Sequence, residues 1–304
     1  MPISDVTRRL GLVAAGRTDI GRVRAHNEDA YLVAALGDGA TVTKGVSATL
    51  RVEGPPALLV VADGVGGAAS GEIASLMATD TILIEMRRRH DRGLLRTLAA
   101  VEESMREAMA AANHVIFTYA SGNPHHRGMA TTATLAIVYE STLLVAQVGD
   151  SRAYLIRNGT VRQLTKDQSL VQRLIDAGEI TEDQAALSDR RNIILQALGS
   201  ESAVYPDFYQ EVPQPGDVLL LCSDGLSNEI SADEFAAIAV QQTDVAAMGD
   251  ALVELANERG GHDNITVVTA RFVIPGSTLD MPIPAVRPEL ASPGLVGRVR
   301  QWLR

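Results

Sequence analysis

The sequence lacks the features that mark secreted, membrane-spanning and nucleic-acid-binding proteins. It has a single cysteine, Cys222, so no disulfide can form within the chain, and a reducing cytoplasm is the expected location. No apolar run approaches the roughly 18 residues of a membrane span. The apolar stretch after Arg8 and Arg9 soon reaches Arg17, which predicts a first strand and not a secretion signal.

Basic residues and nucleotide-binding motifs are also scarce. The net charge of −10 disfavours a nucleic-acid partner, and no basic aromatic stripe suggests a nuclease. No G-x-x-x-x-G-K-[ST] motif is present, which excludes a P-loop enzyme. Neither Asp63 nor Asp224 lies in an Asp-x-Asp pair, which disfavours an aspartyl-phosphate phosphatase. A composition of 46% hydrophobic and 21% charged residues is that of an ordinary globular protein.

Two apolar runs that end in Asp-Gly are the main feature that is present. Residues 57–62 form an apolar run before Asp63-Gly64, and residues 218–222 lead through Ser223 to Asp224-Gly225. Such runs predict buried strands. Two aspartates delivered to one place indicate a hard metal ion held by oxygen ligands.

The first Asp-Gly has two other interpretations. Residues 64–69 match the G-x-G-x-x-A dinucleotide fingerprint. In that case Asp63 would face a pyrophosphate, and the acid expected about 20 residues on would be Glu85, inside a predicted helix. A buried Asp that only caps the next turn is the other alternative, and the repetition at Asp224 argues against it.

The residue pattern predicts strands in runs and helices in pairs. A hairpin is expected within residues 37–56. Further strands are expected at 10–15, 30–35, 57–62, 134–139, 143–148, 153–157, 160–164, 218–223 and 265–273, and helices at 70–89, 94–119, 167–177, 181–187, 232–240 and 245–259. This order predicts an α+β fold, in which two mostly antiparallel sheets pack as a sandwich and each is flanked by a helix pair. Residues 1–274 form the predicted domain.

Acidic residues recur at the ends of these predicted elements. They are Glu28, Asp29, Asp63, Asp150, Asp224 and Asp263. Carboxylates brought together would repel one another unless divalent cations lay between them. A two-metal site, with ions roughly 3.5–4 Å apart, can hold and deprotonate a water for in-line attack on phosphorus. Arg24 is then a candidate bidentate clamp for phosphate oxygens.

With these residues in view, the sequence resembles the metal-dependent serine/threonine protein phosphatases of the PPM or type 2C family, in their bacterial form. The resemblance covers residues 10–274. It rests on five motifs in the family's order: Arg24-x-x-Asn27-Glu28-Asp29, Asp63-Gly64-x-Gly66-Gly67, Gly149-Asp150-Ser151-Arg152, Ser223-Asp224-Gly225 and Asp263-Asn264. It implies the same sandwich with flanking helix pairs, and an enzyme that hydrolyses phosphoserine and phosphothreonine in proteins through a metal-bridging hydroxide.

The resemblance also implies a role for each site residue. Asp63 would bridge two Mn²⁺ or Mg²⁺ ions, and Gly64 would bind through its carbonyl. Asp224 and Asp263 would complete one metal, and Asp150 with Asp224 would hold a third. Glu28 and Asp29 would act mainly through metal-bound waters. Arg24 would hold the phosphate and, with Asp29 and Asp63, belong to the catalytic set. The implied partners are phosphorylated proteins, including a serine/threonine kinase that the enzyme opposes.

The sequence departs from the family pattern at two places. Val65 stands where animal-type members have a histidine proposed as general acid, and bacterial members often have methionine there. Ala130-Thr131-Thr132 replaces Gly-Thr-Thr. His125 and His126 precede it, and two solvated loop residues are a simpler interpretation than a metal site. A catalytically silent relative that only binds partners is the alternative function, although all the acidic positions are intact. A monomer is expected.

The composition changes after residue 274. Five prolines mark residues 275–304 as a tail outside the domain. Apolar residues at its end share one side of a short predicted helix with a cationic rim, namely Leu295, Val296, Val299, Trp302 and Leu303. The expectation is that this segment is disordered or docks on its own domain.

Overall fold

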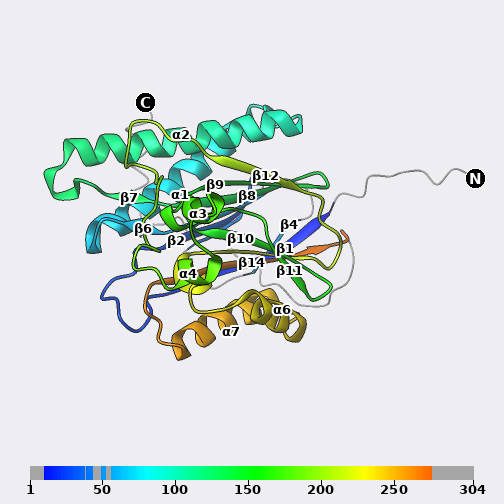
Figure 1. Ribbon diagram of the computed structural model, residues 1–304. Helices are drawn as coiled ribbons and strands as arrows, with labels where there is room; N and C mark the ends of the chain where they lie inside the picture. The colour runs from blue at the N-terminus through cyan, green and yellow to red at the C-terminus, as the bar shows by residue number, and fades with distance from the viewer. Residues whose placement is uncertain (1–9, 38, 44–48, 53–55, 276–304) are drawn as a thin grey trace, which may run out of the picture.

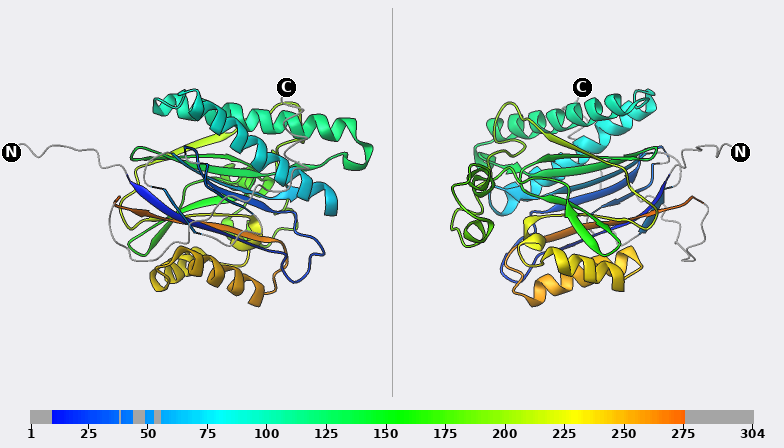
Figure 2. Two further views of the ribbon diagram at one scale, coloured as in Figure 1. Left: turned by 180° about the vertical axis from the view of Figure 1, so that it is seen from behind. Right: turned by 45° about the vertical axis from the view of Figure 1, so that its right-hand side comes forward.

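A computed structural model describes residues 10–37, 39–43, 49–52 and 56–275. Two six-stranded antiparallel sheets pack face to face, with helices on both outer faces (Figures 1 and 2). Sheet A has the order β11 (Thr160–Gln163), β10 (Arg152–Arg157), β13 (Val218–Cys222), β14 (Ile265–Val273), β1 (Gly11–Asp19) and β4 (Thr49–Val52). Sheet B has the order β12 (Asp207–Glu211), β9 (Thr142–Val148), β8 (Ala133–Tyr139), β5 (Ala57–Ala62), β2 (Ala30–Ala35) and β3 (Thr41–Thr43). The predicted sandwich is confirmed.

Each sheet carries one pair of helices on its outer face. The pair α1 (Ala68–Asp91) and α2 (Leu98–Gly122) covers sheet B, and the pair α6 (Ala232–Gln241) and α7 (Val245–Glu258) covers sheet A. Short helices α3 (Leu170–Asp176), α4 (Glu182–Ala186) and α5 (Asp224–Ser227) and the turn η1 (Pro124–His126) lie in the connections. A small third sheet pairs β6 (Gly64–Val65) with β7 (Ala130–Thr131).

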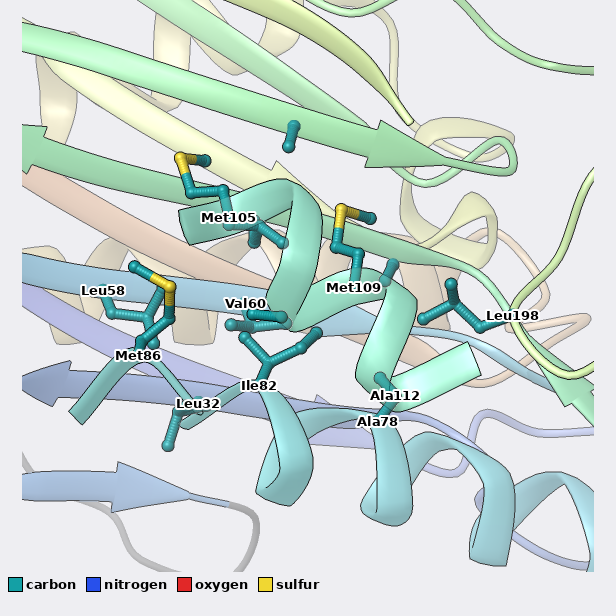
Figure 3. Close-up of a cluster of buried hydrophobic side chains, with 14 of the residues drawn as sticks. Leu32, Leu58, Val60, Ala78, Ile82, Met86, Met105, Met109, Ala112 and Leu198 are labelled. Carbon is teal, nitrogen blue, oxygen red and sulfur yellow. The ribbon is translucent and has the colours of Figure 1, made fainter. Parts of the chain in front are cut away.

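Three apolar layers hold these parts together, because burial of apolar surface is the main stabilising contribution to folding. The first, between the α1–α2 pair and sheet B, includes Leu58, Ile82 and Met105 (Figure 3). The second fills the space between the two sheets, and the third lies between sheet A and the α6–α7 pair. Residues of β2 and β5 are buried on both faces, since one face meets sheet A and the other meets the helices.

Local sequence signals set several boundaries as predicted. Asn158 and Gly159 both have positive φ, as the type I′ turn between β10 and β11 requires. The expected capping boxes are present at Thr181 with Gln184 and at Ser231 with Glu234.

The hairpin predicted within residues 37–56 is wrong. The strands β3 and β4 form, but β3 pairs with β2 at the edge of sheet B, and β4 pairs with β1 at the edge of sheet A. Isolated short hairpins are marginal, and each strand gains more by extending an existing sheet.

Helix starts also differ from the prediction. Helix α1 begins at Ala68 with Gly67 as its N-cap, and not after Ser70. Helix α2 begins at Leu98, where the Thr97 side chain caps it, and not at residue 94. Strand β12 and helix α5 were not predicted. The amphipathic end predicted for the tail lies outside the described residues.

Candidate active site

The predicted acidic residues lie at one end of the sandwich, across the seam between the sheets. In sheet B, Asp29 precedes β2, Asp63 follows β5 and Asp150 follows β9, and the strand registers place these three chain ends together. In sheet A, Asp224 follows β13 and Asp263 precedes β14. A hydrogen bond from Ser223 Oγ to Asp29 Oδ2, 2.7 Å long, joins the two sheets here. The site is therefore built from both sheets.

Asp63 is at the electrostatic centre of this group. Burial raises the pKa of its carboxyl well above the usual value, and repulsion from the carboxylates of other site residues raises it further. Those residues are Asp29, Asp224, Asp150 and Asp263. Because Asp63 interacts electrostatically with all four, the structure places these predicted residues close to one another.

Asp29 is almost fully enclosed, with 1% of its surface exposed. Burial raises the pKa of Asp29 to about 7, although hydrogen bonds from Thr266 and Ser223 to its carboxylate lower it. The Ser223 hydroxyl donates to Asp29 and accepts a hydrogen bond from the Thr266 amide. Ser223 therefore sets the orientation of Asp29.

Asp150 and Asp224 form the side of the site nearest to helix α3. Burial raises the pKa of Asp150 to about 7, and the charges of Asp224 and Asp167 add to this. Burial also raises the pKa of Asp224, with repulsion from Asp263 as the next contribution. A positive charge nearby would favour the ionised form of each of these carboxyl groups.

Arg24 contacts the group from the solvent side. Its Nη2 donates to Asp263 Oδ2 at 2.6 Å, and its side chain remains 53% exposed. Burial raises the pKa of Glu28, while the charge of Arg24 opposes that shift. Arg24 thus combines contact with the acids and access to a ligand from solution.

Close backbone approach fixes the loop at Asp63-Gly64. A Cβ on Gly64 would lie 2.2 Å from the Gly71 carbonyl oxygen, and one on Gly71 would lie 1.8 Å from Glu28 Oε2. A side chain at Gly64 would collide with backbone, and one at Gly71 would displace the Glu28 carboxylate. The two glycines let the Glu28 carboxylate and the Gly64 backbone meet beside the first turn of α1.

Asn264 holds the Arg24–Asp29 segment in place. Its side-chain oxygen accepts from the Glu28 amide at 2.7 Å, and its nitrogen donates to the carbonyls of Ile20 and His26, each at 2.9 Å. Its motif was recognised in the sequence, but this role was not predicted, because it depends on contacts between chain segments far apart in sequence.

The donor set fits divalent cations of the magnesium and manganese type, which prefer carboxylate, carbonyl and water oxygens. In the described part of the chain, no three His, Cys, Asp or Glu side chains are arranged to hold a metal ion as they stand. Asp263 is instead held by Arg24 and by the Asn264 amide. The fit rests on the identity and burial of the donors.

A cleft of about 810 Å³ opens beside the acids. The α3–α4 segment forms one wall, and helix α5 with the His262 loop forms the other. Gln168 joins the first wall to the site through two hydrogen bonds. Its side-chain oxygen accepts from the Gly149 backbone amide at 3.0 Å, and its own backbone amide donates to the Gly149 carbonyl at 2.9 Å.

The two departures from the family pattern are placed by the structure. Val65 lies in β6 and is 42% exposed. The hydroxyls of Thr131 and Thr132 reach the backbone of Asp63, a contact that was not predicted from the sequence. His126 contacts Ser70 Oγ at 3.1 Å and packs near Tyr119, whereas His125 is exposed.

Comparison with known proteins supports the same assignment. The protein phosphatase 2C family model matches residues 47–265. The serine/threonine phosphatase stp of Listeria welshimeri is 38% identical over 252 residues, which cover 83% of this chain and 92% of that protein. The S. agalactiae serine/threonine phosphatase structure has a TM-score of 0.76 at 30% identity and covers 86% of this chain and 99% of that one.

A third similar structure is the catalytic domain of the serine/threonine protein phosphatase PstP, solved in complex with 2 manganese ions. It has a TM-score of 0.69 at 35% identity, and the match covers 87% of this chain and 99% of that one.

The chain belongs to the protein phosphatase 2C family, a metal-dependent family. It is a protein-serine/threonine phosphatase of the PPM type, and phosphorylated proteins are its substrates. No helix in the described ranges combines the length and the apolar character that a bilayer crossing requires.

Proposed function

We propose that the chain hydrolyses phosphoserine and phosphothreonine at the acidic site on the seam of the sandwich. The observation that carries this proposal is the electrostatic convergence of four carboxylates on Asp63, next to an exposed arginine. Bound Mn²⁺ or Mg²⁺ would act as a Lewis acid and activate a water for in-line attack on phosphorus. The substrate phosphoryl group then lies between Arg24 and the buried acids.

The proposed ligands follow from position. Asp63 would bind both ions, and Gly64 would bind through its backbone carbonyl. Asp224 and Asp263, at the ends of sheet A strands, would complete one metal. Glu28 and Asp29 would hold bound waters. Asp150, at the cleft wall with Asp224, would hold a third ion.

Side chains of this protein would orient the phosphate and transfer protons. Arg24 gives two charge-assisted hydrogen bonds to phosphate oxygens and so orients phosphorus. Asp29, which accepts hydrogen bonds from Ser223 and Thr266, is the candidate for proton transfer from the attacking water. Val65 cannot donate a proton, so protonation of the leaving group would fall to a metal-bound water or to another residue.

The proposal extends to the organisation of the protein. Residues 1–274 would form the catalytic domain and residues 275–304 a tail. The enzyme would act as a monomer in the cytoplasm, without a nucleic-acid partner, and reverse the action of a serine/threonine kinase. The acidic net charge and the single buried cysteine support this setting.

Turnover assays test the proposal directly. Purified protein is assayed with p-nitrophenyl phosphate and with matched phosphothreonine and phosphotyrosine peptides, in manganese and then in excess chelator. In manganese, we expect turnover of p-nitrophenyl phosphate and the phosphothreonine peptide, and little turnover of the phosphotyrosine peptide. Excess chelator should abolish all activity, and added manganese should restore it. Turnover that is unchanged in chelator would contradict the metal site. Manganese binding without turnover of any substrate would favour the silent binding module.

A further inference from the structure

The backbone of Asp63 is held on both sides by two threonines from the neighbouring chain segment. Thr131 Oγ1 and the Thr132 amide both donate to the Asp63 carbonyl, each at 2.8 Å. The Asp63 amide in turn donates to Thr132 Oγ1 at 3.0 Å. Both polar groups of the Asp63 backbone are therefore satisfied by this dipeptide, just beyond the end of β5.

The contacts continue from Thr132 to the loop that carries Asp150. Thr132 Oγ1 and Ser151 Oγ are 2.7 Å apart. The Ser151 carbonyl accepts from Thr134 Oγ1 at 2.6 Å and from Gln147 Nε2 at 2.9 Å, so the serine itself is fixed. Thr131, Thr132 and Ser151 have no exposed surface. Hydrogen bonds in such an enclosed place are hard to replace with water.

Packing brings the same two segments together. A Cβ on Gly149 would lie 2.6 Å from Thr132 Cγ2, so the threonine methyl group occupies the space that a side chain would need. Gly149 has a φ of 99°, which favours glycine independently. The Thr132 hydroxyl thus hydrogen-bonds with the Asp63 amide and Ser151 Oγ, and its methyl group packs against Gly149, the residue before Asp150.

We propose that Thr131, Thr132 and Ser151 form a buried hydroxyl relay that positions Asp63 and Asp150 relative to each other for cation binding. The inference rests on the proposed function, because it assigns both aspartates to metal ions. The three residues are positioning residues and touch no substrate. Groups that orient metal ligands from behind contribute to affinity because they reduce the rearrangement that binding requires.

Manganese affinity is the direct test of the relay. Thr132→Val removes the hydroxyl and nearly keeps the shape, and Thr132→Ser keeps the hydroxyl. The matched control is Thr269→Val, since Thr269 is 1% exposed, lies mid-strand in β14 and donates to the Val245 carbonyl at 2.7 Å, away from the acids. Each full-length protein is titrated with Mn²⁺ by calorimetry, and its melting temperature is measured with and without Mn²⁺.

We expect Thr132→Val to weaken Mn²⁺ binding by about 10- to 100-fold, the usual cost of losing such a supporting group. Its gain in melting temperature with Mn²⁺ should shrink accordingly. Thr132→Ser should bind within about threefold of wild type. Thr269→Val should keep wild-type affinity, even though both valine variants melt earlier without metal.

Three other results would overturn one proposal or the other. Wild-type affinity in Thr132→Val would overturn the relay, and equal loss in Thr132→Val and Thr269→Val would show general destabilisation instead. Failure of the wild-type protein to bind Mn²⁺ would overturn the proposed function itself. If Thr132→Val does not fold, Ser151→Ala carries the test, with weaker Mn²⁺ binding expected and unchanged binding contradicting the relay.

Discussion

Arg24 and Asp263 are joined in the structure, whereas their proposed roles are to hold phosphate and a cation. Substrate and metal binding must therefore exchange this ion pair for two new contacts. Both side chains are partly exposed, 53% for Arg24 and 34% for Asp263. Pairs of this kind contribute only about 0–1 kcal/mol, so the exchange costs little.

The first prediction follows for Arg24→Ala. Loss of a bidentate, charge-assisted contact costs about 1.5–3 kcal/mol. We expect KM to rise by about 10- to 150-fold for both the phosphopeptide and p-nitrophenyl phosphate, since both present the same phosphate. Steady-state kinetics at saturating manganese measure this. Arg22→Ala is the matched control, because Arg22 is exposed two residues away. An unchanged KM for Arg24→Ala would make Arg24 an ordinary surface residue.

The second prediction concerns Asp63→Asn, Asp224→Asn and Asp263→Asn. Each removes one charge from the proposed shared cation site, so metal-dependent turnover should be abolished. Asp63→Asn should also melt at a higher temperature than wild type in chelator, because burial and repulsion raise the pKa of Asp63 and an amide removes that cost. Turnover and melting curves are compared with Asp91→Asn, at an exposed position. Near-normal turnover in any of the three would contradict the assigned site.

At the scale of elements, patterns within one segment were predictable, and pairings between segments were less so. The strands at residues 57–62 and 265–273 and both capping boxes follow from periodicity and turn residues, which are local. Strand β12 was not predicted because its sequence is polar and lies at a sheet edge, where alternation is weak. The acids of the candidate site could be predicted because each lies within a recognisable motif. Thr131, Thr132 and Ser151 act only through contacts between distant segments, which periodicity does not reveal.

Helix α1 provides the third prediction, through Asp80 at its middle. Burial raises the pKa of Asp80 from 3.8 to about 6. In the folded state the carboxyl is therefore protonated at pH values where the unfolded chain is already ionised. Wild-type stability should decrease as the pH rises from about 4 to 6, with no further change from this group above that range.

Comparison with Asp80→Asn tests the effect of pH. At pH 7 the variant should be more stable by up to about 3 kcal/mol, the equivalent of about two pKa units, and this gain should nearly vanish at pH 4. Urea denaturation in chelator at both pH values measures the free energy of unfolding. A stability difference that is the same at pH 4 and pH 7 would mean that the buried charge is not its cause.

For the whole molecule, the proposed catalytic machinery lies between residues 24 and 263, and sheet A is complete at Val273. The fourth prediction is that deletion of residues 275–304 leaves p-nitrophenyl phosphate turnover within about twofold, a change of less than 0.5 kcal/mol in the activation barrier. Steady-state kinetics and circular dichroism on the truncated and full-length proteins measure this. Lost turnover with retained secondary structure would show that the tail contributes to the active domain.

The position of β14 has a consequence for the synthesis of this protein. β14 is the last strand in the described part of the chain, yet it lies inside sheet A, where it joins β1 to β13. Chains are made from the N-terminus at about 5–20 residues per second, so β1 must wait for its partner while nearly all other elements are translated. Asp263 arrives just ahead of that strand. A nascent chain that stops before β14 therefore lacks one acid of the proposed site, and the site can be completed only after Ile265–Val273 has paired with β1.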